Sequence, residues 1–296
     1  MGNITAARFE GTVPVRDGRK LGVAEFGTPH GQTVVWFHGT PGARRQIPEE
    51  ARRIAQSRDL RILGLDRPGV GWSPAHRYGC VFDFVADVEM VVDHLGIGNF
   101  SVVGLSGGGP YALAVAAGLA DRVRSVGILD GVVPTVGPDA VPGGVVGLAK
   151  VVAPLLPVIR RPAGWALTVL MRASKPFGSR GLDLYAALSP PGDRAVLRRA
   201  DVKEMFLDDL ATNGGHSMRA IVDDGILFTK DWGFDPGVID VPVWWWHGRD
   251  DHIVPAAHAE HFVPSLRHGT LFVREGESHL GGLAIAGEVL DTVLDW

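Results

Sequence analysis

Residues 102–110 have the sequence VVGLSGGGP, and this stretch decides the fold class of the chain. The apolar run 100–105 predicts a short buried strand, and the run 111–119, rich in Ala, Leu and Val, predicts a helix. Between the two elements, Ser106 has a glycine two positions before it and another two positions after it. Such a sharp turn needs small neighbours, because strand and helix approach closely, and it lifts the serine hydroxyl towards the N–H groups that begin the helix. The turn lacks the Gly-Lys-Ser/Thr of a phosphate-binding P-loop and the glycine spacing of a dinucleotide-binding turn.

Composition limits the class of protein. The chain has 296 residues, 46% of them hydrophobic, which suits one large α/β domain or one domain that carries an insertion. Its 29 Lys and Arg against 33 Asp and Glu give a net charge of −4, so we expect no nucleic-acid partner. The single cysteine, Cys80, permits no internal disulfide, and prolines and glycines interrupt the longest apolar stretch, 141–159. We therefore expect a cytoplasmic protein without a membrane span.

Strand and helix patterns alternate along most of the chain. An Asp-Gly pair at 17–18 predicts a hairpin between two strands, and further apolar runs predict strands at 32–37, 60–65, 100–105, 123–129, 241–246 and 269–273. This alternation predicts an α/β fold with a mostly parallel, eight-stranded sheet and helices on both faces. Between 132 and 234 the alternation stops and the pattern is helical. We expect this segment to be a helical cap inserted into a core domain of residues 1–131 and 235–296.

The Gly-x-Ser-x-Gly turn resembles the nucleophile elbow of the α/β-hydrolase family. Three more segments extend the resemblance. Residues 38–42, His-Gly-Thr-Pro-Gly, are similar to the family's His-Gly-x-Pro-Gly loop, and residues 248–255 are similar to its Gly-x-x-Asp-x-x-Val-Pro segment. Residues 276–280, Gly-Glu-Ser-His-Leu, resemble the loop that carries the catalytic histidine. The resemblance covers the chain apart from 132–234, and it implies an α/β-hydrolase fold.

A serine hydroxyl is a weak nucleophile until a base takes its proton and an acid orients the base. The resemblance implies the order Ser, acid, His, which gives Ser106, Asp251 and His279 as the catalytic residues. Asp250 is the alternative acid if the alignment is shifted by one residue. Asp130 is another, because some relatives carry the acid after that earlier strand.

The same resemblance implies an oxyanion hole of two backbone N–H groups. One belongs to Gly107, the residue after the nucleophile, and the other to Thr40 in the loop after the strand 32–37. Pro41 has no N–H to donate. We interpret His38 as a residue that braces this loop.

Several residues allow competing interpretations. His252, His258, His261 and His268 lie close in sequence but match no metal-ligand pattern, so we expect them on the solvated surface. His216 either lines the pocket or caps a helix. Apolar side chains between 132 and 234 are candidates for the pocket lining, although ordinary packing explains them as well: Trp165, Met171, Phe177, Met205, Phe206 and Trp232.

These observations predict a serine hydrolase that cleaves small carboxylic esters with an apolar acyl group and needs no metal or organic cofactor. Serine at the turn, where dehalogenases and epoxide hydrolases of the family carry Asp, argues against those two reactions. The 38–42 loop is also similar to that of proline iminopeptidases, which would require acids in the cap, and Asp208-Asp209 and Asp223-Asp224 are candidates. A carbon–carbon bond hydrolase and a ligand receptor also fit the same fold. The sequence does not specify the oligomeric state.

Overall fold

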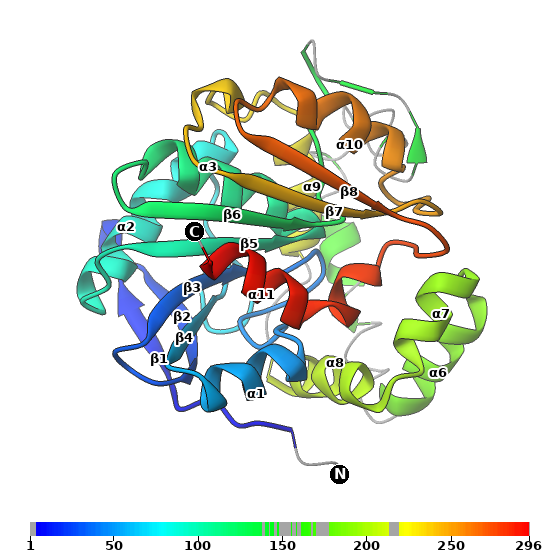
Figure 1. Ribbon diagram of the computed structural model, residues 1–296, viewed down its shortest axis with the longest axis horizontal. Coiled ribbons are helices and arrows are strands. Elements are labelled where there is room, and N and C mark those ends of the chain that lie inside the picture. Colours follow the sequence, from blue (N-terminus) through cyan, green and yellow to red (C-terminus); the bar gives the residue numbers. More distant parts are fainter. Residues whose placement is uncertain are drawn as a thin grey trace.

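An eight-stranded sheet runs through the centre of the molecule in the computed structural model (Figure 1). The structure describes residues 4–137, 178–212 and 219–295, together with scattered positions between 140 and 169. Across the sheet the strands lie in the order β1-β2-β4-β3-β5-β6-β7-β8. The pairs β1–β2 and β2–β4 are antiparallel, and the other neighbouring pairs are parallel. The predicted fold class, a mostly parallel eight-stranded sheet, is confirmed. The strands are β1 (Phe9–Pro14), β2 (Lys20–Gly27), β3 (Gln32–Phe37), β4 (Leu60–Leu65), β5 (Phe100–Leu105), β6 (Val123–Leu129), β7 (Val243–Gly248) and β8 (Gly269–Arg274).

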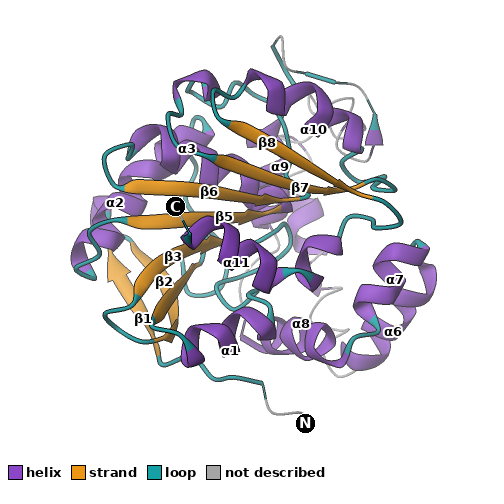
Figure 2. Cartoon of the chain, in the orientation of Figure 1, coloured by secondary structure: helices purple, strands orange, loops and turns teal. Residues whose placement is uncertain are grey.

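Helices cover both faces of the sheet (Figure 2). On one face α1 (Glu49–Ser57) and α11 (Ala286–Leu294) share a hydrophobic cluster with Val34 and Trp36 of β3. On the other face α2 (Val85–His94), α3 (Gly109–Gly118) and α10 (Ala256–Phe262) share a cluster with Val35 and Phe37. Successive residues of a strand point to opposite faces, so a continuous apolar run is what a sheet buried on both sides requires.

Helix α1 begins later than the sequence predicts. The charged stretch after the 38–42 loop predicts a helix from about residue 43 to residue 57, but the helix of the structure begins at Glu49. The N–H of Gln46 donates to the Ala43 carbonyl at 2.9 Å and that of Ile47 to the Arg45 carbonyl at 2.7 Å, so residues 43–47 make turn bonds and not the four-residue bonds of an α-helix. Pro48 then stands immediately before the first turn, a place that tolerates its missing N–H.

Between β6 and β7 the described residues form α6 (Gly178–Leu188), α7 (Pro191–Leu197), α8 (Ala200–Thr212) and α9 (Arg219–Phe228). Val196 of α7 and Met205 of α8 are buried in the same cluster as Trp36, so these helices pack against the sheet domain. The boundaries 132–234 of a separate cap stay a prediction. Among the described residues, no helix is both long enough and apolar enough to cross a membrane.

Candidate active site

Ser106 lies on a sharp turn between β5 and α3. Its backbone φ is 50°, in the left-handed region that costs a non-glycine residue on the order of 1 kcal/mol or more. Its neighbours must be small. A Cβ on Gly104 would lie 2.7 Å from the carbonyl oxygen of Gly108, and a Cβ on Gly108 would lie 2.2 Å from that of Phe37. The glycines therefore let α3 start against the ends of β5 and β3, with Ser106 held at the corner.

The structure brings Ser106, His279 and Asp251 together. The Ser106 hydroxyl lies 2.8 Å from Nε2 of His279, and Nδ1 of His279 lies 2.7 Å from Oδ2 of Asp251. Because the carboxylate accepts the Nδ1 hydrogen, Nε2 is left as the acceptor for the hydroxyl proton. The three side chains come from the loops after β5, β7 and β8, and the carboxyl ends of parallel strands meet at one edge of the sheet.

Electrostatics favour an ion pair between the acid and the base. Burial opposes charge on Asp251, but hydrogen bonds from His247 and His279 hold the pKa of its carboxyl well below the usual range. The other oxygen, Oδ1, accepts the N–H groups of Ile253 and Val254 at 2.8 and 3.0 Å. Burial also opposes charge on His279, yet the hydrogen bond to Asp251 raises its pKa above the ordinary value of 6.5. The pair can therefore hold a proton taken from Ser106.

The hydrogen bond of His279 Nδ1 goes to Asp251 and to neither of the two alternative acids. Asp250 is exposed to solvent. Asp130 is buried, and its two oxygens accept the N–H groups of Gly248 and Gly282 at 2.9 and 3.2 Å, which links the loop after β7 to the turn after His279. Burial raises the pKa of Asp130 to about 7. Its backbone φ is 49°, so the chain turns sharply after β6 just as it does after β5.

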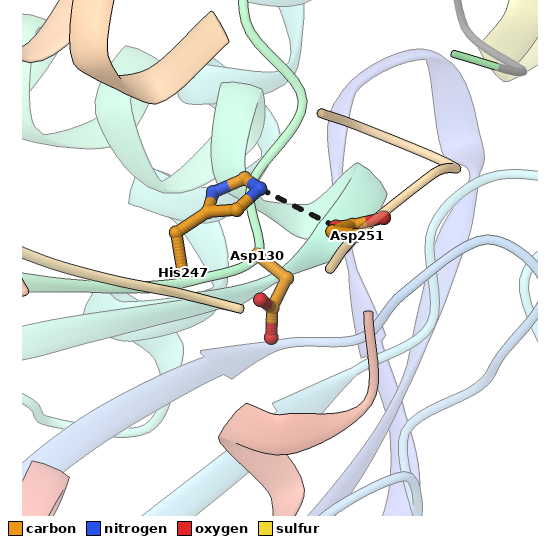
Figure 3. Close-up of side chains that lie close together, drawn as sticks. All are labelled: Asp130, His247 and Asp251. Carbon is orange, nitrogen blue, oxygen red and sulfur yellow. Dashed lines mark ion pairs between the residues drawn. The ribbon is translucent and has the colours of Figure 1, made fainter. Parts of the chain in front are cut away.

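Asp130, His247 and Asp251 form a tight buried cluster (Figure 3). Their ligand-type atoms lie within 4.8 Å of one another, a spacing that a metal ion could use. Hydrogen bonds already account for the grouping, however. Nε2 of His247 donates to the Val254 carbonyl at 2.7 Å and lies 3.3 Å from Oδ2 of Asp251, and Nδ1 accepts the Trp245 indole N–H at 3.1 Å. His247 thus steadies Asp251, a role that the sequence motifs did not reveal and that only its position four residues before Asp251 hints at.

Thr40 and Gly107, the two predicted oxyanion donors, touch each other. A Cβ added to Gly107 would lie 2.4 Å from the Thr40 hydroxyl. His38 is buried before them and donates from Nδ1 to the Gly39 carbonyl at 2.7 Å, while its Nε2 accepts the Arg67 N–H at 3.3 Å. Burial and the Arg67 charge lower the pKa of His38 well below its usual value, so it is a neutral hydrogen-bonding residue.

A cavity of about 510 Å³ opens beside Ser106 and His279. Its wall is mostly apolar and draws on α6, α8 and the loops after β3, β5, β7 and β8. Of the six apolar residues singled out between 132 and 234, Phe206 lines this cavity. Met205 and Trp232 are buried in the hydrophobic clusters, Trp165 is 67% exposed, and Met171 and Phe177 lie outside the described residues.

The surface prediction for the nearby histidines is partly wrong. His252, His261 and His268 are exposed, but His258 is buried. A Cβ on Gly143 would lie 3.7 Å from Nε2 of His258, so the chain after β6 covers this face of α10. His216 lies outside the described residues.

Comparisons with known proteins agree with this fold. A sequence model of the alpha/beta hydrolase fold matches residues 32–283. A proline iminopeptidase of Xanthomonas citri is 36% identical over 111 residues, and the alignment covers 36% of this chain and 35% of that protein. The chain therefore aligns with about a third of the length of these curated iminopeptidases. A non-heme haloperoxidase of Rhodococcus erythropolis is 28% identical over 90% of this chain and 92% of its own length. The solved structure of an esterase from Exiguobacterium antarcticum superposes with a TM-score of 0.69 at 20% identity, over 97% of this chain and 98% of that one.

Proposed function

The chain belongs to the α/β-hydrolase family, and from this premise we propose that it is a serine hydrolase that cleaves carboxylic esters with an apolar acyl group. The observation that carries the proposal is the hydrogen-bond chain from Ser106 through His279 to Asp251, placed at the wall of a largely apolar cavity. The cavity volume of about 510 Å³ lies within the range of small-molecule pockets.

In the proposed first step, Ser106 Oγ attacks the ester carbonyl carbon while its proton passes to Nε2 of His279. The carbonyl π electrons move to oxygen, and the N–H groups of Gly107 and Thr40 stabilise the resulting oxyanion. When the intermediate collapses, His279 gives its proton to the departing alkoxide, so an alcohol leaves and Ser106 is acylated.

Water completes the reaction. His279 takes a proton from water, the hydroxide attacks the acyl carbon, and collapse returns the proton to Ser106 and releases the carboxylic acid. Asp251 stays ionised throughout and stabilises the charged imidazole. The scheme requires no metal or organic cofactor. We further propose that the 132–234 segment is the cap that shapes the cavity, and that the protein acts in the cytoplasm.

Intact-mass analysis after treatment with a fluorophosphonate tests the proposal. We expect one phosphonyl adduct on the wild type and none on Ser106→Ala, together with turnover of p-nitrophenyl acyl esters by the wild type only. Adduct formation on Ser106→Ala would place the nucleophile elsewhere. A folded wild type without an adduct would contradict the enzyme proposal and favour a ligand receptor.

Aminopeptidase activity is a second candidate, and one observation favours it. The carboxylate of Asp209, from α8, lines the cavity that also contains Ser106 and His279. It could hold a substrate amine, whereas Asp208 pairs with Arg45 and Arg52. Prolyl and other aminoacyl p-nitroanilides, tested beside acyl esters, separate the candidates. Turnover of the aminoacyl substrates that disappears in Asp209→Asn would support the aminopeptidase.

A further inference from the structure

A buried polar network joins α9 to the loop that carries the predicted oxyanion donor. Its centre is the ion pair between Arg67 and Asp224, whose side chains are 3% and 8% exposed and lie 2.8 Å apart. Arg67 follows β4, and Asp224 comes from α9, which lies 157 residues away in the sequence. Tyr111 of α3 donates its hydroxyl to the second Asp224 oxygen at 2.8 Å.

Arg67 holds three successive residues of the loop. Its guanidinium donates to the carbonyl of His38, to the carbonyl of Gly39 at 3.0 Å and to the hydroxyl of Thr40 at 2.8 Å. The planar, rigid fork of an arginine fixes several acceptors at once. The backbone between these acceptors therefore has little freedom to turn.

Asp224 contacts both the arginine and the loop. Its Oδ2 accepts both the Arg67 guanidinium and the Thr40 hydroxyl, the latter at 2.6 Å. Burial raises the pKa of Tyr111 well above its ordinary value, so its hydroxyl stays a neutral donor to this carboxylate. Both Asp224 oxygens are thus occupied by buried donors, and the negative charge is balanced by Arg67.

We infer that Arg67 and Asp224 are positioning residues: they set the direction of the Thr40 backbone N–H towards the developing oxyanion. The inference rests on the proposed function. Its consequence is that the oxyanion hole is complete only while α9 is docked on the loop after β3. Oxyanion stabilisation depends strongly on donor placement, because the donors must match the position that the oxygen occupies in the transition state.

The test compares Asp224→Asn with the wild type. One assay measures turnover of an acyl ester, and the other measures inhibition by a trifluoromethyl ketone that carries the same acyl group. The adduct of this ketone with Ser106 places an oxyanion at the site. Losing one oxyanion donor typically costs about 100- to 1,000-fold in kcat, so a misdirected donor should lower kcat by roughly 10- to 100-fold. KM should change by less than about threefold, because ground-state binding is retained. The ketone Ki should rise by the same factor as kcat/KM falls.

Asp208→Asn is the matched control. Asp208 also joins a helix from the 132–234 segment to arginines of the sheet domain, since it pairs with Arg45 and Arg52, whereas Asp224 bonds Thr40 itself. We expect this variant to have a lower melting temperature than the wild type and an unchanged kcat. If Asp224→Asn likewise loses only melting temperature, its role is structural and the inference is wrong.

Thr40→Val keeps the inference testable if Asp224→Asn does not fold. It removes the hydroxyl from the network while keeping the backbone N–H and leaving the ion pair in place. We expect the same loss of kcat and of ketone affinity, and recovery of both in Thr40→Ser. Normal kcat in Thr40→Val would overturn the inference alone, whereas a wild type that forms no fluorophosphonate adduct would overturn the proposed function with it.

Discussion

Ser106 and Asp130 share an uncommon backbone conformation, with φ of 50° and 49°, at the ends of the adjacent strands β5 and β6. Residues with side chains adopt it only where the surroundings hold them there. At Ser106 the surroundings are close backbone contacts of glycines, and at Asp130 they are the two N–H groups that its carboxylate accepts. Both positions therefore direct a polar side chain to the edge of the sheet where the loops meet.

Replacing Asp251 with Asn tests whether Asp251 is the catalytic acid. In the wild type the raised pKa of His279 keeps it protonated to higher pH than an ordinary histidine, so the acid limb of kcat/KM should lie above pH 6.5. Removing the Asp251 charge lowers that pKa, so the limb should move to lower pH. An Asn amide also donates to Nδ1 and favours the wrong tautomer, so kcat should fall by roughly 1,000- to 10,000-fold.

The measurement is the pH dependence of kcat/KM for an acyl ester in both proteins. Asp250→Asn is the control, because its side chain is exposed one residue away, and its profile should match the wild type. If Asp250→Asn loses most of its kcat/KM while Asp251→Asn stays active, the catalytic acid is Asp250.

Gly108 lets the start of α3 lie against the end of β3 and the loop that follows it. A Cβ there would lie 2.2 Å from the carbonyl oxygen of Phe37 and 2.8 Å from that of His38, both backbone atoms that cannot move without displacing β3 or its loop. We expect Gly108→Ala to lower the free energy of unfolding by about 2 kcal/mol, since forced overpacking of a well-packed site costs of that order.

Urea denaturation measures the difference, with Gly98→Ala as the control. Gly98 precedes β5, and an added Cβ would meet no atom within 4 Å, so its effect should stay within about 0.5 kcal/mol. Equal midpoints for the two variants would show that α3 can shift away from β3 without cost.

The strands were the most predictable elements. β3, β4, β5 and β6 have the predicted ranges, because each is a mainly apolar run bounded by polar residues or glycine. Helix α8 shows the limit of such patterns. Met205 packs against the sheet and the next residue, Phe206, lines the cavity. Helical spacing indicates that both are apolar, but it does not indicate which of two apolar surroundings each one meets.

The site was predictable where motifs follow strands and not where partners meet across the chain. Fixed offsets within two loops indicated Asp251 and His279, and the structure brings both to Ser106. The sequence suggests Asp224 only as a holder of substrate amines and does not indicate its pairing with Arg67. That contact depends on how α9 lies against the loops, and no local pattern of sequence encodes it.

Across the whole molecule, three buried carboxylates from the described part of the 132–234 segment are bound to loops of the sheet domain. Asp193 of α7 accepts the Leu280 N–H at 2.7 Å, next to His279, and Asp209 of α8 accepts the Ala43 N–H at 3.0 Å. Asp224 of α9 makes the third such link. Docking of these helices is therefore tied to buried acids beside the site, and the stability of the fold becomes sensitive to pH.

The sign of that sensitivity follows from the pKa shifts. Burial raises the pKa of Asp209 and of Asp130 to about 7 from the ordinary value of 3.8, so the folded state binds these protons more tightly than the unfolded state. Their stabilising contribution is complete below about pH 4 and is lost as pH rises through 7. His279 acts in the same direction, because its pKa is higher in the folded state than the ordinary value of 6.5. Its stabilising contribution is complete below the ordinary pKa and is lost as pH rises through the folded pKa.

We therefore expect the melting temperature of the wild type to fall by roughly 5 °C or more between pH 5 and pH 8, since each unit of pKa shift corresponds to about 1.4 kcal/mol. Asp209→Asn removes one titrating group while keeping an oxygen to accept the Ala43 N–H. It should melt close to the wild type at pH 5 and above it at pH 8. Thermal denaturation followed by circular dichroism at several pH values measures both slopes. Parallel slopes for the two proteins would mean that Asp209 stays ionised in the folded state, and that solvent reaches its carboxylate through the cavity beside Ser106.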